Sequence, residues 1–281
     1  MVLTTFSDEN FERLSKLIQG TWGIKMPPAK RSMIQARLAR RLRALGLGSL
    51  DEYCDFVFCE EGNEEELVHL IDAISTNKTD FFREPDSIEK LVQQAVPELI
   101  RERGAGVRKP VHLWSAGCAT GEEPYTLAMV LLEFAGRHPG LEMDFLVLGT
   151  DVSAAALETA RKAVYPHTRV EPVPMEFRKK YLLRSKRPEA DLVRMAPEVR
   201  DKVRFRQINL MEDFGLREEM DVIFCRNVII YFDKPTQEAV MRRLCDQLAP
   251  GGFLFIGHSE TLNGMKLPVT GVVPTVYRKT G

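Results

Sequence analysis

The chain has no run of about eighteen uninterrupted apolar residues, the length that a membrane-spanning helix requires. Its first residues, MVLTTFSDENFERLSKL, include acids where a secretory signal would have a basic region followed by an apolar one. We therefore expect a protein that does not insert into a membrane and that lies in the cytoplasm.

Cysteine and histidine are sparse, with five of each in 281 residues. The cysteines contain no CxxC pair, and their number is odd, which disfavours both a disulfide framework and a zinc site. The histidines form no HExxH motif or similar ligand spacing, so we expect no catalytic metal. Reduced and mostly buried thiols are the expectation for Cys54, Cys59, Cys118, Cys225 and Cys245.

Charge is nearly balanced in sum, at −1, but unevenly distributed. Between Pro27 and Leu50 there are six basic residues and no acid, and between Asp51 and Glu66 there are eight acids and no base. The basic stretch has three interpretations: it docks an acidic protein, it binds nucleic acid, or it pairs with the acidic segment that follows.

Residues 1–75 carry a helical apolar period and little β-propensity, which predicts an N-terminal all-helical domain. Ser7 and Ser49 precede two of the expected helices and are suited to cap them. Two further helices are expected over 31–44 and 64–74.

From about Val111 onward, short apolar runs alternate with helical segments, which predicts an α/β domain with a covered, mostly parallel, Rossmann-like sheet. We assign 76–95 to a linker that begins the site and 96–281 to this second domain. Prolines and a polar run interrupt the rhythm at about 166–202, where we expect a small antiparallel β insert. The expected strands are 111–117, 144–151, 203–210, 221–232 and 252–258, with a closing edge strand at 272–279, and the helices are 122–137, 154–164 and 235–248.

The first expected strand runs into a loop from Gly117 to Glu123, ahead of a helix. Gly117 permits a sharp turn, and Gly121 would let the backbone approach a ligand. Glu122 and Glu123 suit the helix dipole, but they would repel a pyrophosphate. Because GxGxxG is also missing, a nicotinamide-dependent oxidoreductase is the weaker alternative to an enzyme that binds a sulfonium cofactor.

Polar residues end the next two expected strands. Asp151 is placed to accept hydrogen bonds from ribose hydroxyls, with helix capping as its alternative role. Asn209 and Leu210 offer a polar side chain and a backbone donor to an adenine. Together these features favour an adenosine cofactor without phosphates, S-adenosylmethionine rather than NAD.

Four stretches, TNKTDFFRE (76–84), WSAGCATGEEPY (114–125), IFCRNVIIYFD (223–233) and GHSE (257–260), resemble the chemotaxis receptor methyltransferases, the CheR family. The resemblance covers nearly the whole chain. It implies a class I methyltransferase sheet and an enzyme that methylates glutamate side chains of methyl-accepting chemoreceptors, leaving glutamate methyl esters and S-adenosylhomocysteine. A cofactor-binding adaptor that has lost catalysis is a further alternative.

The resemblance also implies roles for individual residues. Arg83 and Tyr231 would act at the methyl-transfer site, with Glu123 at the methionyl part and Asp151 at the ribose. The implied cofactor contacts are Asn77, Thr79, Arg83, Gly117, Glu123, Asp151, Asn209, Leu210, Arg226 and Asn227.

Structural alternatives exist for some of these residues. Arg83 could pair with Glu84 or Asp80 on the surface, and Tyr231 could be a core aromatic. Arg226 and its neighbour interrupt an apolar strand, and a buried polar group without partners costs about 2–7 kcal/mol, so a specific role is favoured there.

For the basic helix, only the resemblance favours chemoreceptors over nucleic acid as the partner. Chemoreceptor methylation regions in this family are helical bundles with acidic surfaces, which basic residues would attract. The expected docking residues are Arg37, Arg40, Arg41 and Arg43. Nothing in the sequence demands more than a monomer.

Some relatives bind a pentapeptide at the receptor's C-terminal tail by adding a strand to the β insert. Those relatives have glycines in the turn where this chain has RSKRP, from Arg184 to Pro188, and loss of these glycines changes the turn. We predict that receptor-tail pentapeptides do not bind with micromolar affinity. Calorimetric titration tests this, and a micromolar dissociation constant would show that the enzyme does tether its receptor.

Overall fold

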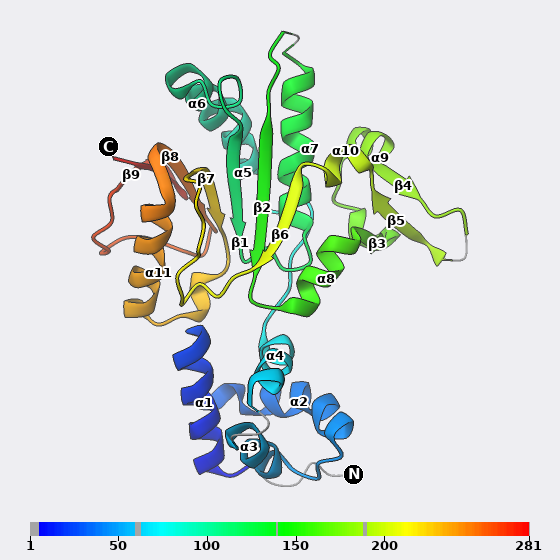
Figure 1. Ribbon diagram of the computed structural model, residues 1–281, viewed down its shortest axis with the longest axis vertical. Helices are drawn as coiled ribbons and strands as arrows, with labels where there is room; N and C mark the ends of the chain where they lie inside the picture. Colours follow the sequence, from blue (N-terminus) through cyan, green and yellow to red (C-terminus); the bar gives the residue numbers. More distant parts are fainter. Residues whose placement is uncertain (1–5, 60–62, 139, 188–189, 281) are drawn as a thin grey trace.

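The structure is a computed structural model that describes all residues except 1–5, 60–62, 139, 188–189 and 281. Glu60 and Glu61 of the acidic segment and Pro188 of the insert's turn therefore lie outside the described residues. Figure 1 shows a helical domain below a sheet with helices on both faces, and a small β insert that projects from one side of the sheet.

The helical domain contains α1 (Asp8–Trp22), α2 (Arg31–Leu45), α3 (Leu50–Phe58) and α4 (Asn63–Ile74), as predicted. Ser7 Oγ accepts a hydrogen bond from Asn10 N at 3.2 Å, and Ser49 Oγ accepts one from Glu52 N at 3.1 Å, so both predicted caps are confirmed. The apolar stripes meet in a separate core that includes Leu14, Ile18, Ile34, Leu38, Tyr53 and Leu70.

The connection to the second domain is partly helical. α5 (Pro85–Lys90) continues through a π-helical turn (Leu91–Ala95) into α6 (Val96–Arg103), so the second half of the segment assigned to a linker is helix. Residues 75–80 have no regular secondary structure, and Ser75 to Thr79 line the site.

The central sheet has the order β6-β2-β1-β7-β8-β10-β9, and β10 runs antiparallel to both of its neighbours. Along β1, Val111 and Leu113 join one core cluster while Trp114 and Ala116 join the other, so both faces are buried. This confirms the predicted mostly parallel α/β fold. The strands are β1 (Val111–Ala116), β2 (Phe145–Asp151), β6 (Val203–Gln207), β7 (Met220–Cys225), β8 (Leu248–Ile256), β9 (Val269–Val273) and β10 (Val276–Lys279).

Three helices follow the sheet strands at the predicted places: α7 (Glu122–Gly136), α8 (Ala154–Lys162) and α11 (Lys234–Gln247). The strand predictions differ from the structure at their ends. β7 stops at Cys225 because Arg226 turns away to an ion pair, and β10 lies between β8 and the unpredicted β9 instead of closing the sheet. The sequence of β9 contains Thr270 and Gly271 and lacks a buried face, so its signal was weak.

The insert is a three-stranded antiparallel sheet in the order β3-β5-β4, as predicted. Its strands are β3 (Val164–Pro166), β4 (Leu182–Arg184) and β5 (Leu192–Met195), with a short 3-10 turn η3 (His167–Val170), α9 (Met175–Tyr181) and α10 (Pro197–Arg200) around them. It packs against α7, where the Tyr165 ring lies 6.4 Å from that of Tyr125 and Tyr181 Oη donates to Glu133 Oε1 at 2.7 Å.

The helical domain touches the sheet domain where the strands end. Asn209 Nδ2 donates to Thr21 O at 2.8 Å, Gln19 Nε2 donates to Asp233 Oδ2 at 2.9 Å, and Ser153 Oγ donates to Asp72 Oδ1 at 2.7 Å. The carboxyl ends of the parallel strands therefore face the helical domain, which is where ligands bind in such sheets.

All five cysteines carry free thiols, and Cys59 is the exposed one. Among the described residues, no helix combines the length and apolar character of a membrane span, and no group of three or more His, Cys, Asp or Glu residues is arranged to hold a metal ion.

A buried ion pair joins α2 to α4 within the helical domain. Glu66 is 2% exposed and accepts hydrogen bonds from Tyr53 Oη and Arg41 Nε, both at 2.8 Å. Arg41 Nη2 lies 2.6 Å from the same carboxylate. The basic segment and the acidic segment therefore do pair, through Arg41 and Glu66, as in the third interpretation of the charge pattern.

We predict that Glu66→Ala lowers the free energy of unfolding by about 3–5 kcal/mol, because it leaves a partly buried guanidinium without its partner. Chemical denaturation followed by circular dichroism measures this. The exposed neighbour Glu65 is the control, and Glu65→Ala should change stability by less than about 0.5 kcal/mol. Equal effects of the two substitutions would show that the buried pair contributes nothing specific.

Candidate functional site

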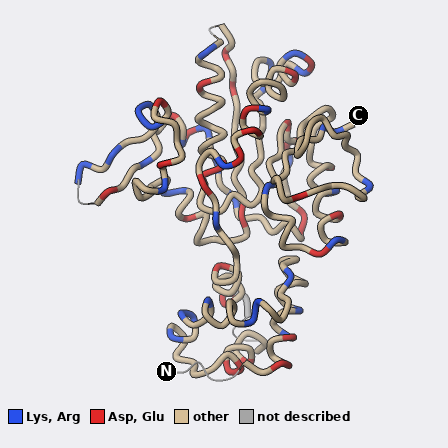
Figure 2. Tube along the Cα trace, turned by 180° about the vertical axis from the view of Figure 1, so that it is seen from behind, with Lys and Arg blue, Asp and Glu red and all other residues tan. Residues whose placement is uncertain are grey.

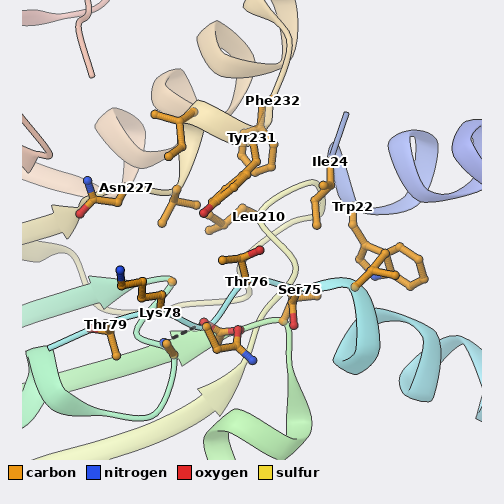
Figure 3. Close-up of a pocket in the computed structure, with 18 of the residues that line it drawn as sticks. Trp22, Ile24, Ser75, Thr76, Lys78, Thr79, Leu210, Asn227, Tyr231 and Phe232 are labelled. Atoms are coloured by element: carbon orange, nitrogen blue, oxygen red, sulfur yellow. Dashed lines mark hydrogen bonds between the residues drawn. The ribbon is translucent and has the colours of Figure 1, made fainter. Parts of the chain in front are cut away.

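A cavity of about 510 Å³ lies between the two domains, at the carboxyl ends of the strands. This is within the range of about 300–1,000 Å³ found for small-molecule sites. Figure 3 shows Asn227 and Tyr231 on one wall, Lys78 and Thr79 on the facing wall, and Trp22 and Ile24 closing the side toward the helical domain.

The loop after β1 forms the floor of the cavity. Gly117 has φ +81°, and a Cβ there would come within 2.4 Å of Val228 Cγ2, so only glycine fits. Gly121 has φ +96°, but its Cβ would meet Ala160 at 2.8 Å, and it does not line the cavity. Glycine is thus required at Gly121 for helix packing, a reason different from the ligand approach that we expected.

Asp151 ends β2 with its carboxylate toward this floor and is 8% exposed. It accepts hydrogen bonds from Ala119 N at 2.8 Å and Ser153 N at 2.9 Å, and Ser153 in turn caps α8. Burial raises the pKa of Asp151, while the backbone hydrogen bonds oppose this rise. The alternative in which Asp151 itself caps the helix is therefore wrong, because the capping oxygen is that of Ser153.

Arg226 is the centre of a buried charge network. Its Nε and Nη2 each lie 2.7 Å from Glu123 Oε2, and Ser115 Oγ donates to the other oxygen of Glu123 at 2.6 Å. Arg226 Nη1 donates to Arg83 O at 2.9 Å and lies 3.6 Å from Glu84 Oε2. This network holds the segment around Arg83 against the start of α7.

Arg83 stands between two residues with left-handed backbone, Phe82 (φ 54°) and Glu84 (φ 52°). Its guanidinium lines the cavity and makes one hydrogen bond among the described residues, from Nη1 to Lys78 O at 3.3 Å. Within the described residues, Arg83 forms an ion pair with neither Glu84 nor Asp80, the two alternatives considered above. Glu84 lies against Arg226, and Asp80 lies 3.7 Å from Arg169. Most of the five Arg83 donors therefore remain available to a ligand.

Tyr231 lies in a 3-10 turn that follows a tightly held loop. Both oxygens of the buried Glu260 accept backbone hydrogen bonds of 2.7–2.9 Å, from Gly257, Asn227, Val228 and Ile229. Tyr231 O accepts a hydrogen bond from Lys25 N at 2.9 Å, and Figure 3 shows its hydroxyl projecting into the cavity. Tyr231 is partly exposed, so it is not the core aromatic of the alternative interpretation.

The structure adds residues that the sequence analysis missed. The helical domain supplies an apolar wall of Trp22, Ile24, Met26 and Met33, and also Lys30. Lys30 Nζ lies 5.7 Å from the Tyr231 ring centroid. Burial lowers the pKa of Lys30, and the nearby positive charges of Lys25 and Arg37 lower it further. Trp22 continues the buried stripe of α1, a pattern that indicates a core residue rather than a cavity wall, and residues 23–30 lie outside any apolar period.

Glu260 was also missed, although it belongs to GHSE, one of the matching stretches. The residues implied as catalytic or cofactor-binding all line this one cavity: Asn77, Thr79, Arg83, Gly117, Glu123, Asp151, Asn209, Leu210, Arg226, Asn227 and Tyr231.

The four arginines expected to dock a substrate are in different environments. Arg37 lines the cavity and donates to Ile74 O and Ser75 O at 2.5 and 2.9 Å, and Arg41 is paired with Glu66. Arg40 and Arg43 are exposed. Figure 2 shows both basic and acidic residues on the helical domain, and some of them are paired, as Arg31 is with Asp8 at 2.5 Å.

Comparison with known proteins is consistent with this geometry. The family described as "CheR methyltransferase, SAM binding domain" matches residues 77–276, and "CheR methyltransferase, all-alpha domain" matches residues 9–75. Chemotaxis protein methyltransferase 2 of Pseudomonas aeruginosa is 38% identical over 273 residues, covering 97% of this chain and 93% of its own.

Two further relatives are similar over nearly their whole length. The chemotaxis protein methyltransferase of Borreliella burgdorferi is 35% identical over 272 residues, covering 96% of this chain and 94% of its own. That of Escherichia coli is 36% identical over 274 residues, covering 96% and 91%. The chain therefore belongs to the CheR family of chemotaxis protein methyltransferases.

Proposed function

We propose that this enzyme transfers the methyl group of S-adenosylmethionine to glutamate side-chain carboxylates of methyl-accepting chemoreceptors. The products are glutamate methyl esters and S-adenosylhomocysteine. The observation that carries the proposal is the cavity in which Asp151, a largely unpaired Arg83 and the Tyr231 hydroxyl meet. Family membership supports the cofactor and disfavours a nicotinamide enzyme.

The donor set fits an adenosylmethionine. Asp151 has lone pairs left to accept ribose hydroxyls, and the partly exposed Asn209 and the backbone of Leu210 lie at the next strand end for an adenine. Glu123, in the first turn of α7, lines the same cavity beside Arg226, and its carboxylate suits an ammonium group. When bound, the sulfonium supplies an electrophilic methyl group.

A carboxylate substrate fits the excess of positive charge in the cavity. Lys30, Arg37, Lys78 and Arg83 line it, against the carboxylates of Glu123 and Asp151. Glu123 is already neutralised by Arg226 at 2.7 Å. The remaining positive field attracts an anionic side chain and supports glutamate over a neutral or cationic substrate.

Little acid–base chemistry is required of the protein, because a free glutamate titrates at about 4.3 and is ionised at neutral pH. The side chains need only orient one carboxylate oxygen and exclude water. Arg83 is suited to fix the carboxylate, and Tyr231 to donate a hydrogen bond to it while its ring faces the sulfonium. A single hydrogen bond from Arg83, rather than a bidentate interaction, would leave the attacking carboxylate oxygen nucleophilic.

For docking, the exposed Arg40 and Arg43 of α2 are the better candidates among the four arginines, since Arg37 and Arg41 are bound within the protein. We propose that they attract the acidic helical surface of a receptor. A cytoplasmic, monomeric enzyme acting without nucleic acid remains our expectation.

We predict that incubation with methyl-labelled S-adenosylmethionine and a receptor cytoplasmic fragment labels the fragment, and that mild alkali then releases the label as methanol. Esters hydrolyse in base, whereas methylated amines do not. A base-stable label would refute the glutamate assignment, and no label at all would favour the adaptor alternative.

We predict that Asp151→Asn weakens S-adenosylhomocysteine binding about tenfold to hundredfold, because it removes a charged acceptor worth about 1.5–3 kcal/mol. Calorimetric titration measures this. Asp144, exposed at the opposite end of β2, is the control position, and Asp144→Asn should leave the affinity unchanged.

The raised pKa of Asp151 adds a pH dependence. As the pH falls through this pKa, the carboxylate gains a proton and loses acceptor strength, so wild-type affinity should decrease while that of Asp151→Asn changes less. Parallel pH profiles of the two proteins would argue against a ribose contact by Asp151.

A further inference from the structure

The β insert contacts the segment that carries Arg83 at three nearby positions. Arg169, in the 3-10 turn η3, donates from Nη2 to Thr79 O at 3.0 Å. The ring of Tyr165 in β3 packs edge-on to Phe81 at a centroid distance of 5.1 Å, and the ring of Phe177 in α9 packs in the same way on Phe82, also at 5.1 Å. Residues 79–82 therefore lie against the insert immediately before Arg83.

Arg169 also contacts a buried acid. The same Nη2 lies 2.6 Å from Glu122 Oε1, and Glu122 is 1% exposed at the start of α7. Its Nη1 lies 3.7 Å from Asp80 Oδ1. One guanidinium thus joins the insert, the first turn of α7 and the Thr79 carbonyl. It also provides the cation that the buried Glu122 carboxylate needs, because an unpaired buried charge is strongly destabilising.

The segment needs such support because its backbone is strained. Phe82 and Glu84, on either side of Arg83, have φ of 54° and 52°. Non-glycine residues keep this conformation only where the surrounding structure enforces it. On the side that faces α7, Phe82 N donates to Thr126 Oγ1 at 3.2 Å. At the next residue, Arg226 Nη1 donates to the Arg83 carbonyl. The insert supplies the remaining contacts, on the Thr79 side.

We infer that Arg169 is a positioning residue for methyl transfer, which holds the Thr79–Phe82 backbone so that Arg83 projects into the cavity. The insert is then part of the machinery that sets the Arg83 geometry, in addition to any role in partner binding. This inference rests on the proposed function only in assigning Arg83 to the substrate carboxylate.

The test compares Arg169→Gln with Arg194→Gln, which makes the same charge change at an exposed position of β5 in the same insert. Hydrogen–deuterium exchange of residues 79–84 should be faster in Arg169→Gln than in wild type, and unchanged in Arg194→Gln. In the methylation assay, kcat should fall about tenfold to hundredfold for Arg169→Gln, since small misplacements of a catalytic group cost this much.

A double-mutant cycle separates positioning from general destabilisation. In an Arg83→Gln background, Arg169→Gln should lower kcat by less than about twofold, because its effect acts through Arg83. Arg169→Lys should restore only part of the rate, since an ammonium lacks the planar guanidinium whose Nη2 contacts Thr79 O and Glu122 while Nη1 lies near Asp80. If Arg169→Gln alone does not fold, Arg169→Gln with Glu122→Gln removes both charges and takes its place.

Unchanged exchange of residues 79–84 in the Arg169 variant would overturn the inference, as would a loss of kcat that adds fully to that of Arg83→Gln. The exchange measurement needs no substrate. It therefore decides the positioning role even if wild type labels no receptor fragment, an outcome that would count against the proposed function alone.

Discussion

The buried guanidinium of Arg226 is the contact on which the site depends. It joins three parts of the chain that meet only in the folded protein: the end of β7, the first turn of α7 through Glu123, and the Arg83 carbonyl. Burying a charge is unfavourable unless its partners satisfy it, and here every nitrogen of the guanidinium lies near an acceptor. Arg226 thereby fixes the Arg83 segment relative to the start of α7.

Much of the fold follows from local patterns. Apolar runs with glycine and proline boundaries predicted the parallel strands, and Ser7 and Ser49 predicted helix starts. Asp151, Asn209 and Leu210 could be named because polar groups at the carboxyl ends of parallel strands converge in space. Other cavity residues, such as Arg83 and Tyr231, were named from the resemblance to the CheR family. β9 was missed because it lacks a buried face. β7 was predicted too long because the partner that turns Arg226 out of the strand, Glu123, is far away in sequence.

Residues whose roles depend on distant partners could not be predicted. The early acid Glu122 looks like a helix-dipole residue, and nothing near it in sequence reveals Arg169. The apolar wall of Trp22 and Met26 belongs to the cavity only because Thr21, Gln19 and Asp72 attach the helical domain to the sheet. Such contacts between domains leave no periodic trace in a sequence.

The hydrogen bond from Lys25 N to Tyr231 O, and the wall beside it, have an evolutionary consequence. The two parts of the chain are recognised as separate families, divided between residues 75 and 77. Yet a substitution among residues 22–33 changes the shape of the cavity shared with the sheet domain. The helical domain and the cavity that it shares with the sheet domain are thus constrained to diverge together, and exchanging the helical domain between homologues would also exchange part of the cavity wall.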